Sequence, residues 1–289
     1  WRPRPVASLI VRALVPPACD VAVRYQAQVI RVFPAPQVFA QTIFGFQLVQ
    51  ADPRVAGINF VAPEDNPVTL ADYGKQMASI AFARTELPDV SVSLHAGELT
   101  IGLVPPKDLR FHIRDAIDVA GANRIGHGVD LLYEDAPYAL LEDMVARDIL
   151  VEINLTSNAV ILGVEGPDHP FETYLAAGVP LTLSTDDEGV SRIDLTHEYT
   201  RATRTYDLGY PVLKQFARNS LSYAFLSGDS LWDNAATGML IEACQSDMPG
   251  AQSPSPACAE FLAGSEKAGL QWKLEQDFTR FEEDWKAKR

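Results

Sequence analysis

The chain is poor in positive charge and in cysteine, and it lacks a long apolar run. Its 289 residues hold 24 Lys and Arg against 38 Asp and Glu, which gives a net charge of -14. A nucleic-acid partner would require a basic surface, so the sequence argues against one. The apolar runs are too short to cross a bilayer, so we expect no membrane span. A neutral small molecule is the easier ligand.

Two short motifs are also missing. No Gly-x-Gly-x-x-Gly follows any predicted strand, which removes the usual signature of a dinucleotide-binding fold. The three cysteines, Cys19, Cys244 and Cys258, lack the close spacing of a zinc knuckle. Cys244 and Cys258 flank a loop rich in Pro, Ser and Gly. They form a disulfide in an exported protein or are two unrelated thiols, and the sequence leaves both open.

The length and composition are typical of a globular enzyme. Hydrophobic residues make up 47% and charged residues 21%. A parallel α/β barrel of about 250 residues fits within this length. The sequence begins at Trp1 and its first residues do not follow the pattern of a signal peptide. We therefore expect an N-terminal truncation.

From residue 21 onward, short apolar segments alternate with helical patterns. Strands are predicted at 21–25, 57–62, 90–95, 124–127, 149–154 and 179–184. Helices are predicted at 36–50 and 69–86, from Pro106 to about Ala120, and at 136–147 and 171–177. This spacing suits βα units, because a parallel strand requires a crossover of about a dozen residues or more. The pattern predicts an α/β fold, either a doubly wound sheet or a (β/α)8 barrel.

The two ends of the chain depart from this alternation. Residues 1–20 form an irregular lead-in with a helical pattern at 6–14. After Thr185 the pattern is helical, with a flexible loop at 245–257 and helices predicted at 191–206, 211–225, 229–243 and 259–286. The predicted parts are therefore the lead-in at 1–20, an α/β portion at 21–225 and C-terminal helices at 226–289.

Polar side chains occur where predicted strands end. His95 and Glu98 follow the third predicted strand, His127 ends the fourth, and Asp186 and Asp187 follow the last. In a parallel α/β barrel, the carboxyl ends of the strands line the active site. Imidazole and carboxylate groups suit zinc, and a nearby carboxyl group moves protons. Two further polar groups have this placement, Glu64-Asp65 and Asn154 to Asn158.

Each of these positions also has a structural interpretation. His127 lies between Gly126 and Gly128, where a histidine is often structural, and one of the two aspartates could cap a helix. Three other histidines lack a strand-end position, and we expect them to be non-catalytic: His112, His169 and His197.

Four motifs together resemble the adenosine deaminase family. They are His95-Ala-Gly-Glu98, Arg124-Ile-Gly-His-Gly128, Asn154-Leu-Thr-Ser-Asn158 and Ser184-Thr-Asp-Asp187, in the family's order and approximate spacing. The resemblance implies a zinc-dependent (β/α)8 barrel that converts adenosine or 2′-deoxyadenosine to inosine or its deoxy form and ammonia. The chain is also similar to the longer growth-factor-related and bacterial exported members. This narrower likeness implies a periplasmic or secreted protein, with the cytoplasm still open.

The resemblance implies a role for each site residue. His95 and Asp186 resemble ligands of one zinc ion. Glu98 resembles the acid that protonates purine N1, and His127 resembles the histidine that orients the attacking water.

Three more residues resemble substrate-binding positions. Asp187 resembles the partner of purine N7, and Gly97 and Ala62 are expected to contact substrate. The family commonly has a glycine where Ala62 stands, so that contact is a departure from its pattern.

A second departure concerns the metal. The family's first strand carries a His-x-His motif that supplies two zinc ligands, and no His-x-His occurs in this chain. Counting back from Asp186 makes the predicted strands numbers 3 to 8 of the barrel, so strands 1 and 2 are expected before Trp1. We expect the chain alone to bind zinc weakly and to have little activity.

Other functions fit the same barrel. The substrate could be another purine or an adenine nucleotide, although Lys107 and Arg192 are the only obvious candidates for a phosphate contact. A non-catalytic, growth-factor-like binding protein is the other alternative. A purely structural or binding role would give no reason to retain Glu98, His127 and the two aspartates together, which counts against this alternative. A homodimer stays open.

Overall fold

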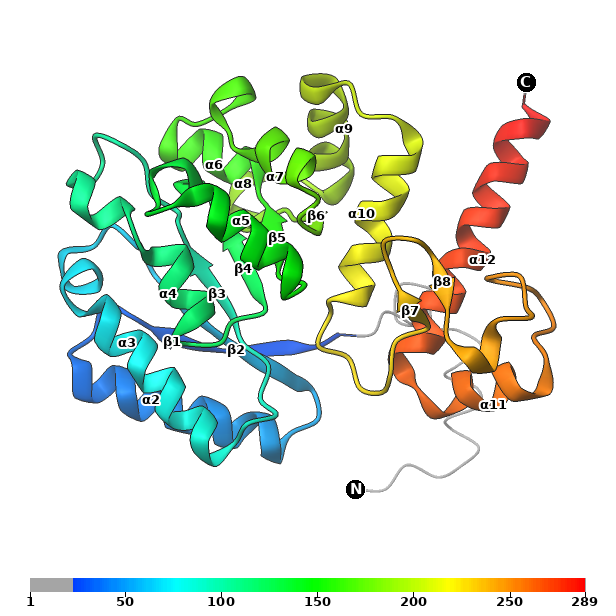
Figure 1. The fold of residues 1–289 in the computed structure, drawn as a ribbon, viewed down its shortest axis with the longest axis horizontal. Coiled ribbons are helices and arrows are strands. Elements are labelled where there is room, and N and C mark those ends of the chain that lie inside the picture. Colours follow the sequence, from blue (N-terminus) through cyan, green and yellow to red (C-terminus); the bar gives the residue numbers. More distant parts are fainter. Residues whose placement is uncertain (1–22, 289) are drawn as a thin grey trace.

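The structure is a computed structural model that describes residues 23–288 (Figure 1). The predicted lead-in at 1–20, with its helical pattern at 6–14, lies outside the described residues. Parallel strands and helices alternate in the first two thirds of the described chain, and a mostly helical region follows. No helix among residues 23–288 combines the length and the apolarity that a membrane crossing requires.

The strands lie side by side in the order of the sequence. They are β1 (Tyr25–Ile30), β2 (Val55–Val61), β3 (Ser93–Ala96), β4 (Arg124–His127), β5 (Leu150–Ile153) and β6 (Leu181–Leu183). β1 pairs with β2, and β3 to β6 pair in succession, all of them parallel. A bridge between Ile58 and Val92 joins the two groups. Sequential order is that of a barrel wall, whereas a dinucleotide-binding sheet reverses its strand order near the middle.

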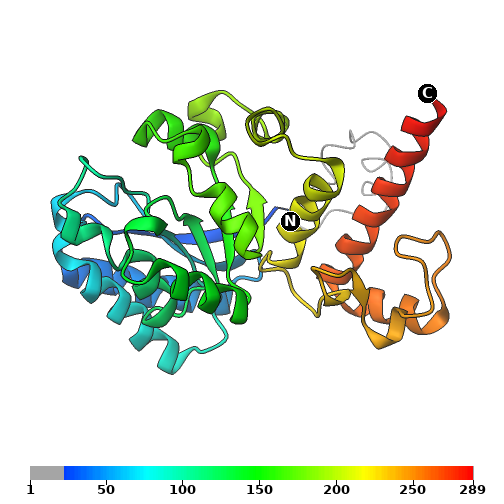
Figure 2. The same ribbon diagram turned by 45° about the horizontal axis from the view of Figure 1, so that its top comes forward.

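Helices connect the successive strands, and most of them cover the outer face of the sheet (Figures 1 and 2). They are α2 (Ala35–Ala51), α3 (Pro67–Glu86), α4 (His112–Asp118), α5 (Pro137–Ala146), α6 (Leu155–Leu162) and α7 (Phe171–Ala177). Short 3₁₀ turns lie between them: η2 (Pro106–Leu109), η3 (Leu131–Tyr133) and η4 (Gly166–Asp168). α3 shows how the sequence sets a start, because Pro67 occupies its first turn and the Asn66 side chain accepts a hydrogen bond from the Val68 amide.

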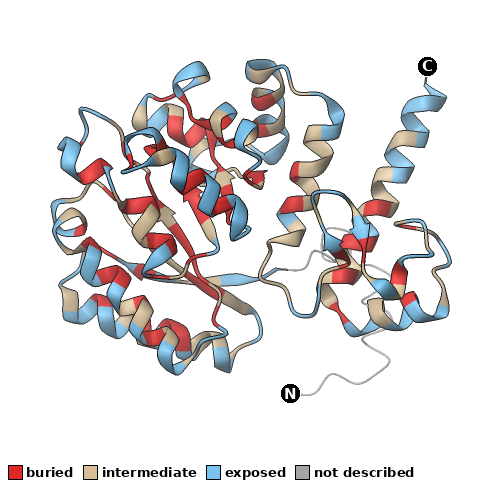
Figure 3. Ribbon diagram, in the orientation of Figure 1, coloured by how far each residue is buried: buried red, intermediate tan, exposed pale blue. Residues whose placement is uncertain are grey.

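One apolar core runs between the strands and these helices. It includes Val29, Ile58, Leu94, Ile125 and Val151, one from each of the first five strands, all fully buried. Figure 3 shows the buried residues concentrated along the strands and on the inner faces of the helices. One core therefore supports all the strands whose carboxyl ends carry the predicted polar residues.

The first predicted strand is wrong in position. The apolar pattern predicted a strand at 21–25, whereas β1 begins at Tyr25 and continues to Ile30. Most of β1 is exposed or half-buried, and Gln26 and Gln28 alternate with its apolar residues. The strand prediction relied on a run of apolar residues, so it fell on the apolar segment before β1 and missed the mixed polar and apolar sequence of β1 itself. A loop was predicted directly after β5, whereas the structure has the helix α6 there, beginning at Leu155.

After β6 the predicted helices are mostly confirmed, with changed bounds. The structure has α8 (Glu188–Ser191), α9 (Leu195–Tyr206), α10 (Tyr210–Ser222), α11 (Pro256–Gly264) and α12 (Glu266–Ala287). The predicted helix at 259–286 is divided at Ser265. This residue is extended, and its hydroxyl accepts a hydrogen bond from the Ala268 amide at the start of α12.

The predicted helix at 229–243 is wrong. This segment forms the antiparallel strands β7 (Trp232–Asn234) and β8 (Met239–Leu240), and then the turn η5 (Glu242–Cys244). The Asn234 side chain accepts a hydrogen bond from the Thr237 amide, and Gly238 has a φ of 71°. Side-chain capping and a left-handed glycine reverse the chain here, and they outweigh the apolar spacing that suggested a helix.

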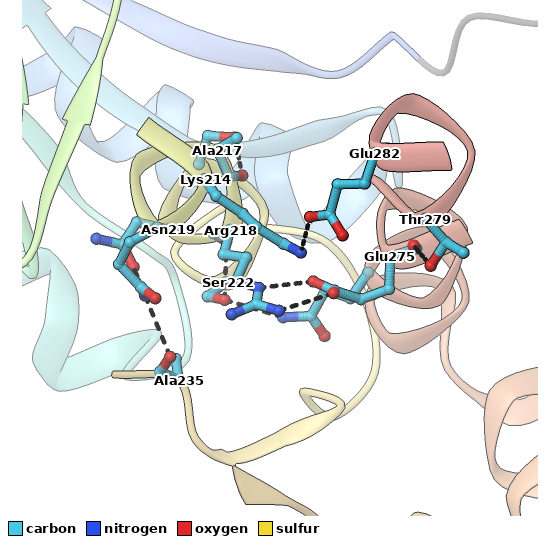
Figure 4. A network of polar contacts seen from close by, with 12 residues as sticks. Lys214, Ala217, Arg218, Asn219, Ser222, Ala235, Glu275, Thr279 and Glu282 are labelled. Carbon is cyan, nitrogen blue, oxygen red and sulfur yellow. Dashed lines mark hydrogen bonds and ion pairs between the residues drawn. The ribbon is translucent and has the colours of Figure 1, made fainter. Parts of the chain in front are cut away.

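The C-terminal region has its own small core, closed by a disulfide between Cys244 and Cys258. Of the two options that the sequence left open, the disulfide is the one observed. α12 is fastened to α10 by two ion pairs, Arg218–Glu275 at 2.7 Å and Lys214–Glu282 at 2.7 Å (Figure 4).

Candidate active site

A cleft of about 630 Å³ lies where the parallel strands end. Its walls come from the ends of β2, β3 and β6 and from the end of α6, and they include Asn59, Ala62, Glu98 and Asp187. Six of the polar residues that the sequence placed at strand ends line this one cavity, because parallel strands direct their carboxyl ends to the same edge: Glu64, Asp65, His95, Glu98, Asp186 and Asp187.

Three possible metal ligands converge in the same place. One ligand atom from each of His95, His127 and Asp186 lies within 4.8 Å of the others. The rings of His95 and His127 are 5.1 Å apart at their centroids. His95 and Asp186 are the two residues that the sequence predicted as ligands, and the structure brings them together.

His95 is held with one ring nitrogen free. Its Nδ1 donates to Asn59 Oδ1 at 3.0 Å, which leaves the Nε2 lone pair for a metal. The fully buried Arg31 donates to the His95 carbonyl oxygen at 2.9 Å. Burial lowers the pKa of His95, and the nearby Arg31 lowers it further. The ring is therefore neutral at pH 7, as a metal ligand must be.

Asp186 is fixed through backbone and side chain. Its φ of 53° is left-handed, which turns the carboxylate away from the direction of β6. Ser157 donates a hydrogen bond of 2.7 Å to Asp186 Oδ2. Asp187 follows at the start of α8, is exposed, and lines the cleft.

His127 ends β4 and is buried. Its φ is 72°, and the Asn158 side-chain amide lies 2.9 Å from its Nδ1, with that of Asn154 at 3.3 Å. Its Nε2 is 4.0 Å from Asp186 Oδ2. Burial, together with the nearby His95, lowers the pKa of His127 to about 3, so the ring is neutral at pH 7.

Glu98 holds its proton at neutral pH. Burial raises the pKa of Glu98 to about 8, and the charges of Glu64 and Asp186 act in the same direction. A carboxyl group with this pKa is a proton donor at pH 7. Its Oε1 lies 3.6 Å from His127 Nδ1, so the acid is inside the polar cluster.

Glu64 holds the loop that carries Glu98. The sequence indicated Glu64 as a polar residue at a strand end but assigned it no role. The Glu64 carboxylate accepts from the Gly97 amide at 3.1 Å and from the Glu98 amide at 2.7 Å. It also accepts from His112 Nδ1 at 2.6 Å. Burial would raise the pKa of Glu64, but His112 and Arg31 hold it at about 2, so Glu64 is charged.

Two predicted substrate residues have left-handed backbones. Gly97 has a φ of 76°, and a Cβ there would lie 2.4 Å from Asp130 Oδ1, so only glycine fits. Its amide is bonded to Glu64 and its carbonyl oxygen accepts from Val129 and Asp130, so its contact with substrate stays a prediction. Ala62 has a φ of 85°, the conformation of a glycine. It lines the cleft.

All seven predicted site residues therefore lie in or beside one cleft. Sequence reasoning missed the residues that orient them. The orienting residues are distant in sequence from the groups they bind: they are Asn59, Glu64, Asn158 and His169. The sequence pattern indicated only Glu64 and Asn158 among them, as polar residues at strand ends.

The donor set fits a divalent metal such as zinc. His95 offers a neutral nitrogen whose other ring nitrogen is already bonded, and Asp186 offers a carboxylate oxygen beside it. Nitrogen and oxygen ligands with bonded outer partners are what zinc selects.

The sequence matches a known family. A family model described as "Adenosine deaminase" covers residues 4–233. An adenosine deaminase from Shewanella denitrificans is 35% identical over 147 residues, which is 50% of this chain and 41% of the relative. The chain thus matches less than half of that relative's length.

Solved structures share the fold. An N6-methyl-AMP deaminase from Arabidopsis thaliana is 25% identical with a TM-score of 0.55, covering 70% of this chain and 54% of the neighbour. An amidohydrolase from Burkhoderia ambifaria, solved with bound Zn, is 18% identical with a TM-score of 0.55. That match covers 72% of this chain and 53% of the neighbour. What these structures share with the chain is its α/β fold of parallel strands.

Proposed function

Because the chain belongs to the adenosine deaminase family, we propose that the protein hydrolyses adenosine or 2′-deoxyadenosine to inosine or 2′-deoxyinosine and ammonia. The observation that carries this proposal is Glu98. It is a protonated carboxyl group at the same cleft as a neutral histidine and an aspartate that suit a metal.

We assign one zinc ion to His95 and Asp186. Such an ion would lower the pKa of a bound water toward 7 and so supply a nucleophile at neutral pH. The expectation that further ligands come from a His-x-His motif on barrel strands outside this chain stays a prediction. Weak zinc binding by the 289-residue chain stays one with it.

The chain's own residues move the protons. Glu98 gives its proton to purine N1, which draws electrons from the ring and prepares C6 for attack. His127 holds the attacking oxygen at its Nε2, and Asp187 accepts a hydrogen bond at the N7 side. The attacking water gives up two protons. One leaves with the amino group as ammonia when the C6–N bond breaks, and the other returns to the Glu98 carboxylate, so the acid is restored for the next cycle. We expect Ala62, which lines the cleft, and Gly97 to contact the purine.

The cleft favours a nucleoside over a nucleotide. Its described lining contains five carboxylate residues and no Lys or Arg: the carboxylates are Glu64, Asp65, Glu98, Asp186 and Asp187. Lys107 is paired with Asp108 at 2.7 Å, and Arg192 is not part of the lining. A phosphate would meet like charge here, and the net charge of -14 repels it further. An adenine nucleotide is therefore the weaker candidate.

The test is the release of inosine from adenosine by the zinc-loaded chain, with AMP and adenine as competing substrates. We expect deamination of adenosine above the rate of a Glu98→Gln control, and a lower kcat/KM for AMP. The absolute rate is expected to be low. If the unmodified chain and the control are equally inactive on all three, the non-catalytic alternative is favoured.

We further propose that the protein works outside the cytoplasm. The disulfide between Cys244 and Cys258 supports this, since such bonds persist in oxidising compartments. Fractionation of producing cells, with thiol labelling of the chain before and after reduction, tests it. A reduced pair in a cytoplasmic fraction would contradict it.

A further inference from the structure

A buried chain of hydrogen bonds leads from a backbone amide to the catalytic histidine. It starts at Phe171, whose N–H donates to His169 Nδ1 at 3.1 Å. A backbone amide is always a donor, so His169 Nδ1 must accept and the ring proton must sit on Nε2. His169 is buried, which keeps water from replacing these partners.

The next bond fixes the orientation of a side-chain amide. His169 Nε2 lies 3.1 Å from Asn158 Oδ1, and Nε2 carries the proton, so Asn158 accepts with its oxygen. Its Nδ2 is then directed at His127 Nδ1, 2.9 Å away, and donates to it. Asn158 is itself fully buried, so the amide has no solvent-exposed alternative.

We propose that His169 and Asn158 are positioning residues that set the tautomer of His127 and keep its proton on Nε2, the nitrogen facing Asp186. A ring whose Nδ1 accepts a hydrogen bond carries its proton on Nε2. The proposal concerns where the proton sits and requires no change in the charge of the ring. It rests on the proposed function only for the part that His127 plays in the reaction.

Two neighbouring groups bear on the same nitrogen. Asn154 Nδ2 lies 3.3 Å from His127 Nδ1 and adds a second donor there. Glu98 Oε1 is the competing acceptor that would draw a proton to Nδ1, but at 3.6 Å it is beyond hydrogen-bond distance. The shorter bond from Asn158 therefore decides the tautomer.

The tautomer decides which chemistry the three-residue cluster can perform. With the proton on Nε2, His127 has no lone pair to offer a metal on the side of Asp186, although its position is that of a third ligand. It presents an N–H to the cleft instead, which can hold an attacking oxygen. His95 and Asp186 are left as the ligands of this cluster.

Nitrogen NMR of the histidine rings reads the tautomer directly. The full chain, labelled with ¹⁵N-histidine and kept free of metal by a chelator, has five histidines, and His→Gln replacements assign their signals. The exposed His197 serves as the internal reference for an unrestrained ring. At pH 7 we expect His127 to show an unprotonated Nδ1 and a protonated Nε2.

Two variants test whether the relay is the cause. Asn158→Asp is isosteric and replaces the donor by an acceptor, so the proton of His127 is expected to move to Nδ1. His169→Leu removes the donor that orients Asn158, so the proton is expected to divide between both nitrogens. His169→Gln keeps a donor toward Asn158 and is the matched control, with unchanged His127 signals.

The outcomes separate the relay from the proposed function. A protonated Nδ1 in the unmodified chain, or unchanged signals in Asn158→Asp and His169→Leu, would overturn the relay. In the zinc-loaded chain, Asn158→Asp and His169→Leu are each expected to lower kcat for adenosine by about 10- to 100-fold with KM nearly constant, and the conservative His169→Gln to restore the kcat that His169→Leu loses. If the ring signals behave as expected but the unmodified chain does not deaminate any purine tested, the relay stands and the proposed function fails. A moved proton with an unchanged kcat would overturn the catalytic part.

Discussion

At the scale of single residues, the cleft combines acids with opposite protonation. Glu64 is charged and Glu98 holds a proton, although their segments are joined by hydrogen bonds. The charge of Glu64 is one of the causes that raise the pKa of Glu98. One carboxylate thus anchors the loop and, by the same charge, keeps the neighbouring acid ready to donate.

This arrangement makes stability depend on pH. The pKa of Glu98 is about 8 in the folded chain, against an ordinary value of 4.5. The folded state therefore binds more protons than the unfolded state between these values, and its contribution to stability falls as pH rises from about 4.5 to about 8. Glu98→Gln removes this penalty. We expect it to abolish deamination and to raise the free energy of unfolding by about 1 kcal/mol or more at pH 8, with a smaller difference at pH 5.

Thermal unfolding at both pH values, with a chelator present, measures this effect. Asp65→Asn is the control, because Asp65 is a neighbouring carboxylate that lines the same cleft. An equal or lower melting temperature for Glu98→Gln at pH 8 would contradict the expected proton on Glu98.

Ala62 occupies a backbone conformation that suits glycine, with a φ of 85°. A left-handed alanine costs about 1–2 kcal/mol, part of which a glycine loses again through the greater freedom of the unfolded chain. We expect Ala62→Gly to stabilise the chain by about 0.5–1 kcal/mol in urea unfolding. Ala71→Gly, at an exposed position of the helix α3, should destabilise it by about 1 kcal/mol. Loss of stability in both variants would show that Ala62 is not strained.

At the scale of elements, the loop after β3 is the part that positions the acid. It has no regular structure of its own, and the Glu64 carboxylate binds two successive amides in it. We expect Glu64→Gln to speed amide hydrogen exchange at Gly97 and Glu98, because one amide loses its acceptor. We also expect it to lower kcat by about 10- to 100-fold.

Peptide-resolved exchange measured by mass spectrometry checks the first effect, and Asp65→Asn is again the comparison. Since Asp65 lines the same cleft without binding these amides, its replacement should leave exchange at Gly97 and Glu98 unchanged. Unaltered exchange in Glu64→Gln would show that the loop is held by other contacts.

The sequence predicted the residues that perform chemistry better than those that orient them. His95, Glu98, His127 and Asp186 were found because ionisable side chains at strand ends form a pattern in one dimension. Asn59 binds His95 from 36 residues away, and His169 acts on His127 through Asn158. Such contacts form only when the strands come together in the folded chain, so no local sequence pattern predicts them. The same holds for the hairpin at 229–243, where capping by Asn234 outweighed apolar spacing.

At the scale of the whole molecule, one hydrophobic core lies beneath the cleft and a separate one lies in the C-terminal region. The cleft lies at the ends of the parallel strands, whereas the disulfide closes the C-terminal core, which shares no residue with the cleft. Cys244 and Cys258 are 14 residues apart, and closing such a loop stabilises a protein by about 3 kcal/mol.

The double variant Cys244→Ser/Cys258→Ser is therefore expected to melt at a lower temperature, and to keep the kcat and KM of the unmodified chain well below that temperature. Differential scanning calorimetry and assays at 25 °C measure the two effects, with the reduced unmodified chain as the control. A loss of activity at 25 °C without unfolding would show that the C-terminal region shapes the cleft.

The left-handed residues at the strand ends predict how the protein would respond to selection in the laboratory. At His127 and Asp186 a glycine would relax the backbone but would delete the functional side chain. Ala62 carries no such group. A mutant library selected only for heat resistance should collect glycine at Ala62 and Asp186, whereas a library selected also for deamination should keep it at Ala62 alone. Neither library should collect it at His127, because the loss of this buried ring would leave a cavity and two unpaired amides, those of Asn154 and Asn158. The difference between the two pools would mark the positions where folding and chemistry compete.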